Sequence, residues 1–167
     1  MKTLYLIGFM GSGKSTVGDW LKQKSARFHL DTDQMIVDQY GEIASIFKAE
    51  GESVFRSYET EMLARVPERN YVISTGGGIV ERKENHMLMK NNGLIIFLDT
   101  SFAEVLTRLG EDVSRPLWGQ ADHARYNLYK RRYPVYRSLA DMTVHTDQKT
   151  PDIIAADIME RLPQSYV

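Results

Sequence analysis

Residues 8–16 read Gly-Phe-Met-Gly-Ser-Gly-Lys-Ser-Thr and limit the folds open to this chain more than any other segment. They follow the short apolar run at residues 4–7 and precede a segment with helical spacing, so we expect a strand, a turn and a helix. The glycines let backbone N–H groups turn towards an anion, and the helix adds the positive end of its dipole. Lys14 would reach the outer phosphates of a nucleotide, and the Ser15 hydroxyl would hold Mg²⁺.

The alternative for residues 8–16 is a glycine-rich turn with a surface lysine. With average residue usage, Gly-x4-Gly-Lys-Ser/Thr arises by chance in about one chain in two hundred of this length. A plain turn also leaves the trio Lys14, Ser15 and Thr16 at the start of the helix unexplained. We therefore favour a nucleotide-phosphate loop.

The composition indicates one domain and narrows its partners. The 167 residues are 43% hydrophobic and 26% charged, which suits a single domain with a real core. A net charge of -1 gives no broad basic surface for nucleic acid or acidic membranes. Without cysteine there is no disulfide framework or thiolate metal site, so we expect a cytoplasmic protein. The first apolar run is too short for a signal peptide or a membrane span.

Strand-like and helix-like segments alternate along the chain. This alternation predicts an α/β fold with a mostly parallel sheet covered by helices and ligands at the carboxyl ends of the strands. The expected strands are residues 4–7, 28–30, 71–74, 94–98 and 142–145. The expected helices are residues 14–24, 34–40, 44–50, 53–66, 102–109, 124–139 and 152–162. In the sixth of these, Pro134 should bend or interrupt the helix.

Two aspartates, Asp31 and Asp33, directly follow the second expected strand. Beside a bound nucleotide, one could bind Mg²⁺ while the other accepts a proton from an attacking hydroxyl. The competing interpretation is that Asp33 caps the helix that begins at Gln34. Asp99 also ends an apolar strand, but we interpret it as a strand-end or capping group and keep it as the second choice for Mg²⁺.

Arginines at three places in the sequence could bind an anionic substrate. Arg56 and Glu59 share one helix face, where a surface ion pair would be the simpler explanation. The glycines at residues 76–78 favour a site instead, because they let backbone amides approach a ligand closely. Arg115 and Arg132 could close over phosphates or could simply be solvated, and spacing does not separate these two possibilities.

Six stretches, in this order, resemble the shikimate kinase family, and the resemblance runs nearly end to end. They are residues 8–16, Asp-Thr-Asp at 31–33, Gly-Glu-x-x-Phe-Arg-x-x-Glu at 51–59, Ser-Thr-Gly-Gly-Gly at 74–78, Arg-Pro-Leu at 115–117 and Arg-x-Pro-x-Tyr at 132–136. The resemblance implies one nucleoside-monophosphate-kinase-like domain over residues 1–167, with five parallel strands in the order 2-3-1-4-5. It also implies a substrate-binding region at about 32–66, a lid at about 110–124, and a monomer.

The resemblance further implies the reaction, which is transfer of the ATP γ-phosphoryl group to the 3-hydroxyl of shikimate on the route to chorismate and the aromatic amino acids. Asp33 would contact that hydroxyl as the base, with Lys14 and Arg115 as the phosphate-side cations. Arg56 and Arg132 would hold the substrate carboxylate, and the Gly77 amide would contact a ring hydroxyl. The predicted substrate loop consists of Gly76, Gly77 and Gly78.

ATP and Mg²⁺ are the implied nucleotide and metal. Ser15 and Asp31 would serve the metal, with Arg108 and the segment ending at Pro151 on either side of the adenine. Lys149 stands where the family often has arginine, and Trp118 where it usually has leucine. The implied nucleotide-binding residues are Gly11, Ser12, Gly13, Lys14, Ser15, Thr16, Arg108, Arg115, Lys149 and Pro151.

Two other functions compete with this one. A different small-acid or sugar kinase of the same fold, such as a gluconate kinase, would use the same loops. A nucleotide-dependent switch would need only the phosphate loop, although the chain lacks the Asn-Lys-x-Asp motif of GTPases. The histidines, His29, His86, His123 and His145, match no catalytic role in the family pattern and are interpreted as surface or strand residues.

Overall fold

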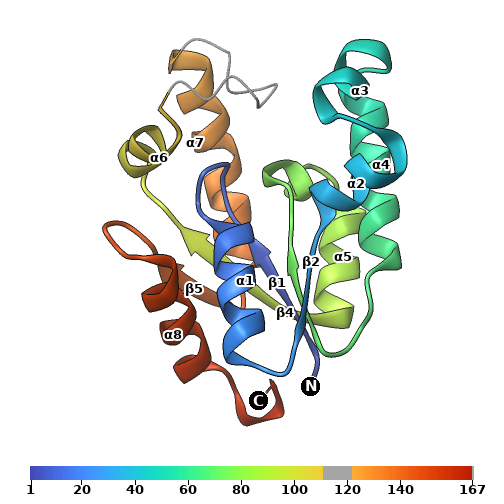
Figure 1. Ribbon diagram of the computed structural model, residues 1–167. Helices are drawn as coiled ribbons and strands as arrows, with labels where there is room; N and C mark the ends of the chain where they lie inside the picture. The colour runs from blue at the N-terminus through green and yellow to red at the C-terminus, as the bar shows by residue number, and fades with distance from the viewer. Residues whose placement is uncertain (111–121, 167) are drawn as a thin grey trace.

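The structure is a computed structural model that describes residues 1–110 and 122–166. Its centre is a five-stranded sheet in the order β2-β3-β1-β4-β5, with every neighbouring pair parallel (Figure 1). The strands are β1 (Thr3–Ile7), β2 (Phe28–Asp31), β3 (Tyr71–Ser74), β4 (Gly93–Asp99) and β5 (Met142–His145). The predicted strand order is confirmed, and each predicted strand is present.

The sheet register brings three loops together. Leu6 in β1 pairs with Ser74 in β3, and Ser74 pairs with Asp31 in β2. The loops that follow these three positions therefore leave the same edge of the sheet as neighbours. In this way the parallel sheet alone places the glycine-rich loop, the aspartates and the second glycine run beside one another.

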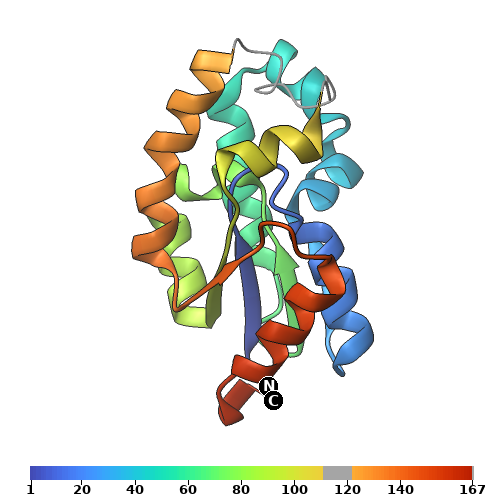
Figure 2. The ribbon, with the colours of Figure 1, turned by 90° about the vertical axis from the view of Figure 1, so that its left-hand side faces the viewer.

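Helices cover both faces of the sheet. The helices are α1 (Lys14–Lys24), α2 (Thr32–Tyr40), α3 (Ile43–Ala49), α4 (Glu52–Arg65), α5 (Lys83–Asn92), α6 (Phe102–Leu109), α7 (Asp122–Leu139) and α8 (Pro151–Arg161), with short 3₁₀ turns η1 (Gly77–Glu81) and η2 (Gln164–Tyr166). Along β1, Leu4 and Leu6 pack towards α1 and α8, whereas Tyr5 and Ile7 pack towards α4, α5 and α7. Figure 2 shows α1 and α8 on one side of the sheet and α5 and α7 on the other.

Helices α2, α3 and α4 have a small core of their own. Ile36, Ile46, Phe55 and Met62 are buried there, apart from the two cores that flank the sheet. Figure 1 shows these helices rising beyond the carboxyl edge of the sheet, on the opposite side from α6 and α7. They span the substrate-binding region predicted from sequence. Most of the predicted lid lies outside the described residues.

Two local expectations were wrong or incomplete, and one competing interpretation is wrong. Helix α5 was not predicted, because among its apolar side chains only Met89 is buried and its other buried residue is the polar Asn85. Helix α7 continues through Pro134 and is not interrupted. The cap of α2 is Asp31, whose carboxylate accepts from the backbone N–H groups of Asp33 and Gln34, so Asp33 is not the capping residue. None of the helices in residues 1–110 and 122–166 combines the length and the hydropathy of a membrane span.

Candidate active site

The glycine-rich loop forms a cradle at the start of α1. Gly11 and Gly13 have φ angles of 77° and 89°, which are left-handed values that glycine adopts without strain. Side-chain atoms also approach Gly11 closely, since a Cβ there would lie 2.7 Å from Leu109 Cγ. The backbone is therefore free to present its N–H groups to a phosphate at the N-terminus of the helix. This arrangement fits the predicted phosphate loop.

Lys14 is held inside this loop. Its side-chain nitrogen Nζ donates to the carbonyl oxygens of Gly8 and Phe9 at 2.8 and 3.0 Å and to Ser12 Oγ at 3.3 Å. These acceptors are uncharged, and an ammonium group binds phosphate oxygens more strongly than neutral oxygens. The contacts keep the lysine at the place where the outer phosphates of a nucleotide would lie.

Ser15 and Asp31 form a pair of oxygen donors next to the loop. The Ser15 hydroxyl donates to Asp31 Oδ2. The other oxygen of Asp31 caps α2 by accepting from the N–H of Asp33 at 2.9 Å and of Gln34 at 3.3 Å. A hydroxyl beside a carboxylate is a donor set that suits Mg²⁺, which prefers oxygen ligands and keeps several waters. The residues present therefore fit the predicted metal.

A cavity of about 720 Å³ runs along the phosphate loop. Lys149 and Pro151 line one end, and Asp33 and Gly77 line the other. Its size suits a nucleotide together with a small acceptor, since ligand pockets are about 300–1,000 Å³. Those predicted nucleotide residues that the structure describes thus border one continuous space with the predicted base.

Arg108 is fixed on the wall of this cavity. Its guanidinium donates to Thr146 O at 2.7 Å, to Glu104 Oε1 at 2.9 Å and to Ser12 O at 3.4 Å. Lys149 lies 3.9 Å from a carboxylate oxygen of Asp157. The planar group of Arg108 is therefore held in one orientation, as a stacking partner for a nucleotide base would need to be.

The ion pair between Arg56 and Glu59 is buried, so the alternative of a surface pair is wrong. Arg56 Nη1 lies 2.6 Å from Glu59 Oε2, and their side chains are 8% and 1% exposed. A second carboxylate, Glu52, lies 2.9 Å from Arg56 Nη2 at the rim. Removing a guanidinium from water is costly. Its burial on α4, close to the phosphate loop, points to a task beyond stabilising the helix.

The glycines at residues 76–78 pack directly against charged side chains. A Cβ on Gly76 would lie 2.6 Å from Asp33 Oδ1 and 2.7 Å from Glu59 Oε1. A Cβ on Gly78 would lie 2.0 Å from Arg56 Nη1. From the sequence we predicted that these glycines let a ligand approach the backbone closely. The structure adds that carboxylates and a guanidinium occupy the space that larger residues would fill.

Arg132 approaches the same glycines from α7. It is 2% exposed, its Nε donates to Glu81 Oε1 at 2.7 Å, and its Nη1 lies 3.6 Å from the place of a Cβ on Gly77. Its other terminal nitrogen, Nη2, is buried and has no hydrogen-bond partner in the described part of the chain. Arg56 and Arg132 therefore both pack against one short turn. Their capture of a single carboxylate stays a prediction.

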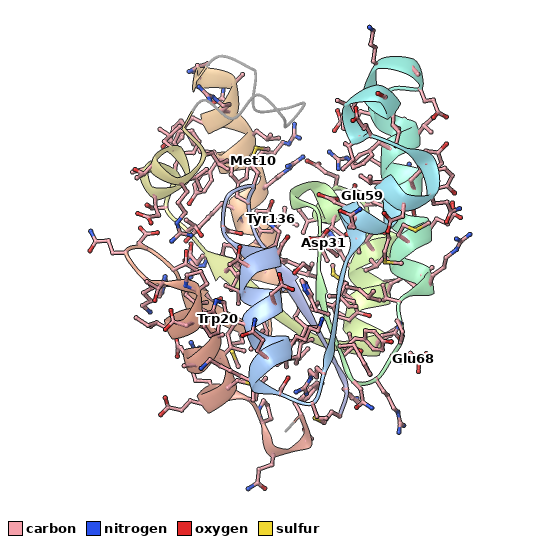
Figure 3. The ribbon with its side chains drawn as sticks, in the orientation of Figure 1. Met10, Trp20, Asp31, Glu59, Glu68 and Tyr136 are labelled. Atoms are coloured by element: carbon pink, nitrogen blue, oxygen red, sulfur yellow. The ribbon has the colours of Figure 1, made fainter. Side chains whose placement is uncertain are left out.

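Burial raises the pKa of Glu59 from 4.5 to about 7, although Arg56 opposes the shift. The carboxylate of Asp33 raises this pKa further. Figure 3 shows Glu59 near Asp31 at the carboxyl edge of the sheet. The cluster of acids and arginines is thus close to a change of charge at neutral pH.

We expect Glu59→Gln to remove a pH dependence of stability. A raised pKa in the folded state stabilises the fold below about pH 4.5, and this contribution is lost as the pH rises through about 7. The wild type should therefore lose unfolding free energy relative to the variant over this range, on the order of 3 kcal/mol. Urea unfolding at pH 5 and pH 8 measures the difference. Glu52→Gln is the control, because Glu52 also pairs with Arg56 but is half exposed. The prediction would be contradicted if the unfolding free energies of wild type and Glu59→Gln changed in parallel with pH.

The remaining candidates fall into three groups. Arg115 lies outside the described residues. Asp99 accepts from the Tyr133 hydroxyl at 3.1 Å and lies 3.1 Å from His145 Nδ1, so these two residues account for its position at the strand end. His29, interpreted as a surface or strand residue, lines the cavity in β2. Its ring nitrogens lie 2.8 Å from Asp19 Oδ1 and 2.8 Å from Ser74 Oγ.

Sequence reasoning gave no role to three residues that shape the site. Glu59 was visible as the partner of Arg56 three positions on, but its burial was not. Tyr136 was part of a recognised motif, and its hydroxyl bonds Gly77 O at 2.6 Å. Glu81, which holds Arg132, carried no signal at all, because its partner is 51 positions away.

A phosphate loop and an aspartate at the carboxyl ends of a parallel sheet, with two buried arginines on the helices beside them, define a small-molecule kinase of the P-loop class. The family model for shikimate kinase matches residues 10–163. A shikimate kinase from Sulfurihydrogenibium sp. (strain YO3AOP1) is 42% identical over 97% of this chain and 98% of its own length. The chain belongs to the shikimate kinase family.

Solved structures agree with this assignment. A shikimate kinase from Acinetobacter baumannii in complex with shikimate has a TM-score of 0.91 and 35% identity, and the match covers 96% of this chain and 92% of that one. The shikimate kinase from Aquifex aeolicus has a TM-score of 0.81 and 34% identity, with coverage of 95% and 94%. The fold and the family therefore rest on both sequence and structure.

Proposed function

We propose that this chain transfers the γ-phosphoryl group of ATP to the 3-hydroxyl of shikimate, giving shikimate 3-phosphate for the synthesis of chorismate and aromatic amino acids. The observation that carries the proposal is the pair of buried guanidinium groups, Arg56 and Arg132, which both pack against the glycine turn beside the phosphate loop. Planar guanidinium groups bind a carboxylate through paired hydrogen bonds. The bound shikimate of the Acinetobacter relative supports the same acceptor.

Asp33 is the proposed base. It lines the cavity in the first turn of α2, and its Oδ1 lies next to the glycine turn. From there it would accept the proton of the acceptor hydroxyl as the phosphoryl group arrives. The proposed acceptor contacts are the carboxylate on Arg56 and Arg132 and a ring hydroxyl on the Gly77 amide, within a loop of Gly76, Gly77 and Gly78.

On the phosphate side, Lys14 and the loop amides would hold the outer phosphates of ATP. Ser15 and Asp31 would hold Mg²⁺, which neutralises phosphate charge when bound. Arg115 is assigned to the transferring group on the resemblance alone. Arg108 on one side, and Lys149 with Pro151 on the other, would bind the adenine. We further propose that the protein acts as a cytoplasmic monomer, without nucleic-acid or membrane partners.

A substrate comparison tests the proposal. Purified protein with ATP and Mg²⁺ should release one ADP for each shikimate 3-phosphate formed, and turnover should stop when the metal is chelated. Gluconate is the competing acceptor, because a gluconate kinase would share the fold. GTP in place of ATP tests the alternative of a nucleotide switch. Well-folded protein that consumes no ATP in response to shikimate would refute the function.

A further inference from the structure

The turn that carries Gly77 is tied to α7 at its far end. Glu81 ends the turn η1, and its Oε1 accepts from Arg132 Nε at 2.7 Å and from Arg131 Nη2 at 2.9 Å. These two arginines lower the pKa of Glu81, although partial burial opposes the shift, so the carboxylate is ionised at neutral pH. One carboxylate thus connects the end of the turn to the buried guanidinium of Arg132.

The turn is also tied to α7 at its beginning. Tyr136, one helical turn after Arg132, is 1% exposed, and its hydroxyl donates to the carbonyl of Gly77 at 2.6 Å. Its ring stacks on Phe97 in β4, with the centroids 5.3 Å apart. Burial raises the pKa of Tyr136 and the charge of Arg132 opposes this, so the hydroxyl remains a proton donor at neutral pH. Figure 3 shows Tyr136 beside the carboxyl edge of the sheet.

These two contacts fix the orientation of Arg132. With Nε on Glu81, the guanidinium cannot rotate about its long axis without breaking a charge-assisted hydrogen bond. Its Nη1 then faces Gly77, and its buried Nη2 is left without a partner in the described residues. A buried donor without a partner is costly, so this geometry reserves Nη2 for an anionic ligand.

We propose that Glu81 and Tyr136 are positioning residues for the acceptor. Together they set the spacing between Arg132 and the Gly77 amide, the two groups that would bind the acid end and a ring hydroxyl. The inference rests on the proposed function, because it concerns the same acceptor site. Neither residue would touch the acceptor, so each acts through the residue it holds.

Two conservative variants test the inference. Tyr136→Phe removes only the hydroxyl, and Glu81→Gln keeps the size of the side chain while removing its charge. Each should raise KM for shikimate about tenfold, as expected for one hydrogen bond, and leave KM for ATP within about twofold. A merely structural defect would change both constants. The matched control for Tyr136→Phe is Tyr133→Phe, on the same helix, whose hydroxyl donates to Asp99 at the end of β4. The control for Glu81→Gln is Glu84→Gln, whose exposed carboxylate pairs with Arg82.

A double variant separates positioning from general destabilisation. If Glu81 acts through Arg132, Glu81→Gln should have little further effect on the acceptor KM in an Arg132→Lys background. If Tyr136→Phe does not fold, Glu81→Gln alone tests the inference, because the side chain of Glu81 is partly exposed. Fully additive effects, or an acceptor KM within about twofold of wild type in the folded variants, would overturn the inference. A wild type that does not phosphorylate shikimate would instead overturn the proposed function.

Discussion

Asp33→Asn should lower kcat by about 10²–10⁴-fold while the affinity for ADP stays close to that of the wild type, since this is the usual contribution of a general base. The amide has the shape of the carboxylate but cannot take up the hydroxyl proton. The side chain lines the acceptor end of the cavity, so its neutralisation leaves the phosphate loop intact. Steady-state kinetics with both substrates varied, together with ADP titration, measure the two effects.

Asp38→Asn is the matched control for this prediction. Asp38 lies on the same helix, α2, and its exposed carboxylate accepts from Gln34 Nε2 at 2.7 Å. It should keep kcat within about twofold, as expected of a surface substitution. Wild-type turnover in Asp33→Asn would remove this residue as the base. A parallel loss of ADP affinity would instead indicate a damaged nucleotide site.

Local patterns in the sequence were enough to predict most of the fold. Continuous apolar runs marked the strands, because a parallel sheet is buried on both faces. Leu4, Tyr5, Leu6 and Ile7 are all fully buried, although they face two different cores. Helix α5 was missed because most of its ten residues are polar and only Met89 among its apolar side chains is buried. The strand order came from the family resemblance rather than from any local pattern.

The candidate site could be predicted only in part, for a physical reason. Residues that follow strands, such as Lys14 and Asp31, could be placed because the sheet gathers the strand ends. The contacts that hold the site in shape join the turn η1 to α7, between residues far apart in sequence. Glu81 with Arg132 and Tyr136 with Gly77 are of this kind, at separations of 51 and 59 positions. Such pairs depend on tertiary packing, which no local spacing records.

The contact between Gly78 and Arg56 leads to the other large expected effect. A Cβ at residue 78 would lie 2.0 Å from Arg56 Nη1 and 2.3 Å from Cζ, so the guanidinium must move in Gly78→Ala. Gly78 does not have a left-handed φ, and alanine fits its backbone. The displaced group can no longer hold both Glu59 and an acceptor carboxylate. We expect the shikimate KM to rise about 10- to 100-fold, the usual worth of a charge-assisted hydrogen bond, with KM for ATP unchanged.

Gly41→Ala is the control that separates lost stability from lost acceptor binding. Gly41 ends α2 with a φ of 93° and has open space around it, so alanine there strains the backbone without touching the site. It should lower the unfolding free energy by about 1 kcal/mol and leave the shikimate KM unchanged. In an Arg56→Lys background, Gly78→Ala should add little, because the group it displaces is already gone. The prediction would be contradicted if folded Gly78→Ala kept a shikimate KM within about twofold of wild type. In that case Arg56, in its position beside Glu59, would not bind the carboxylate of shikimate.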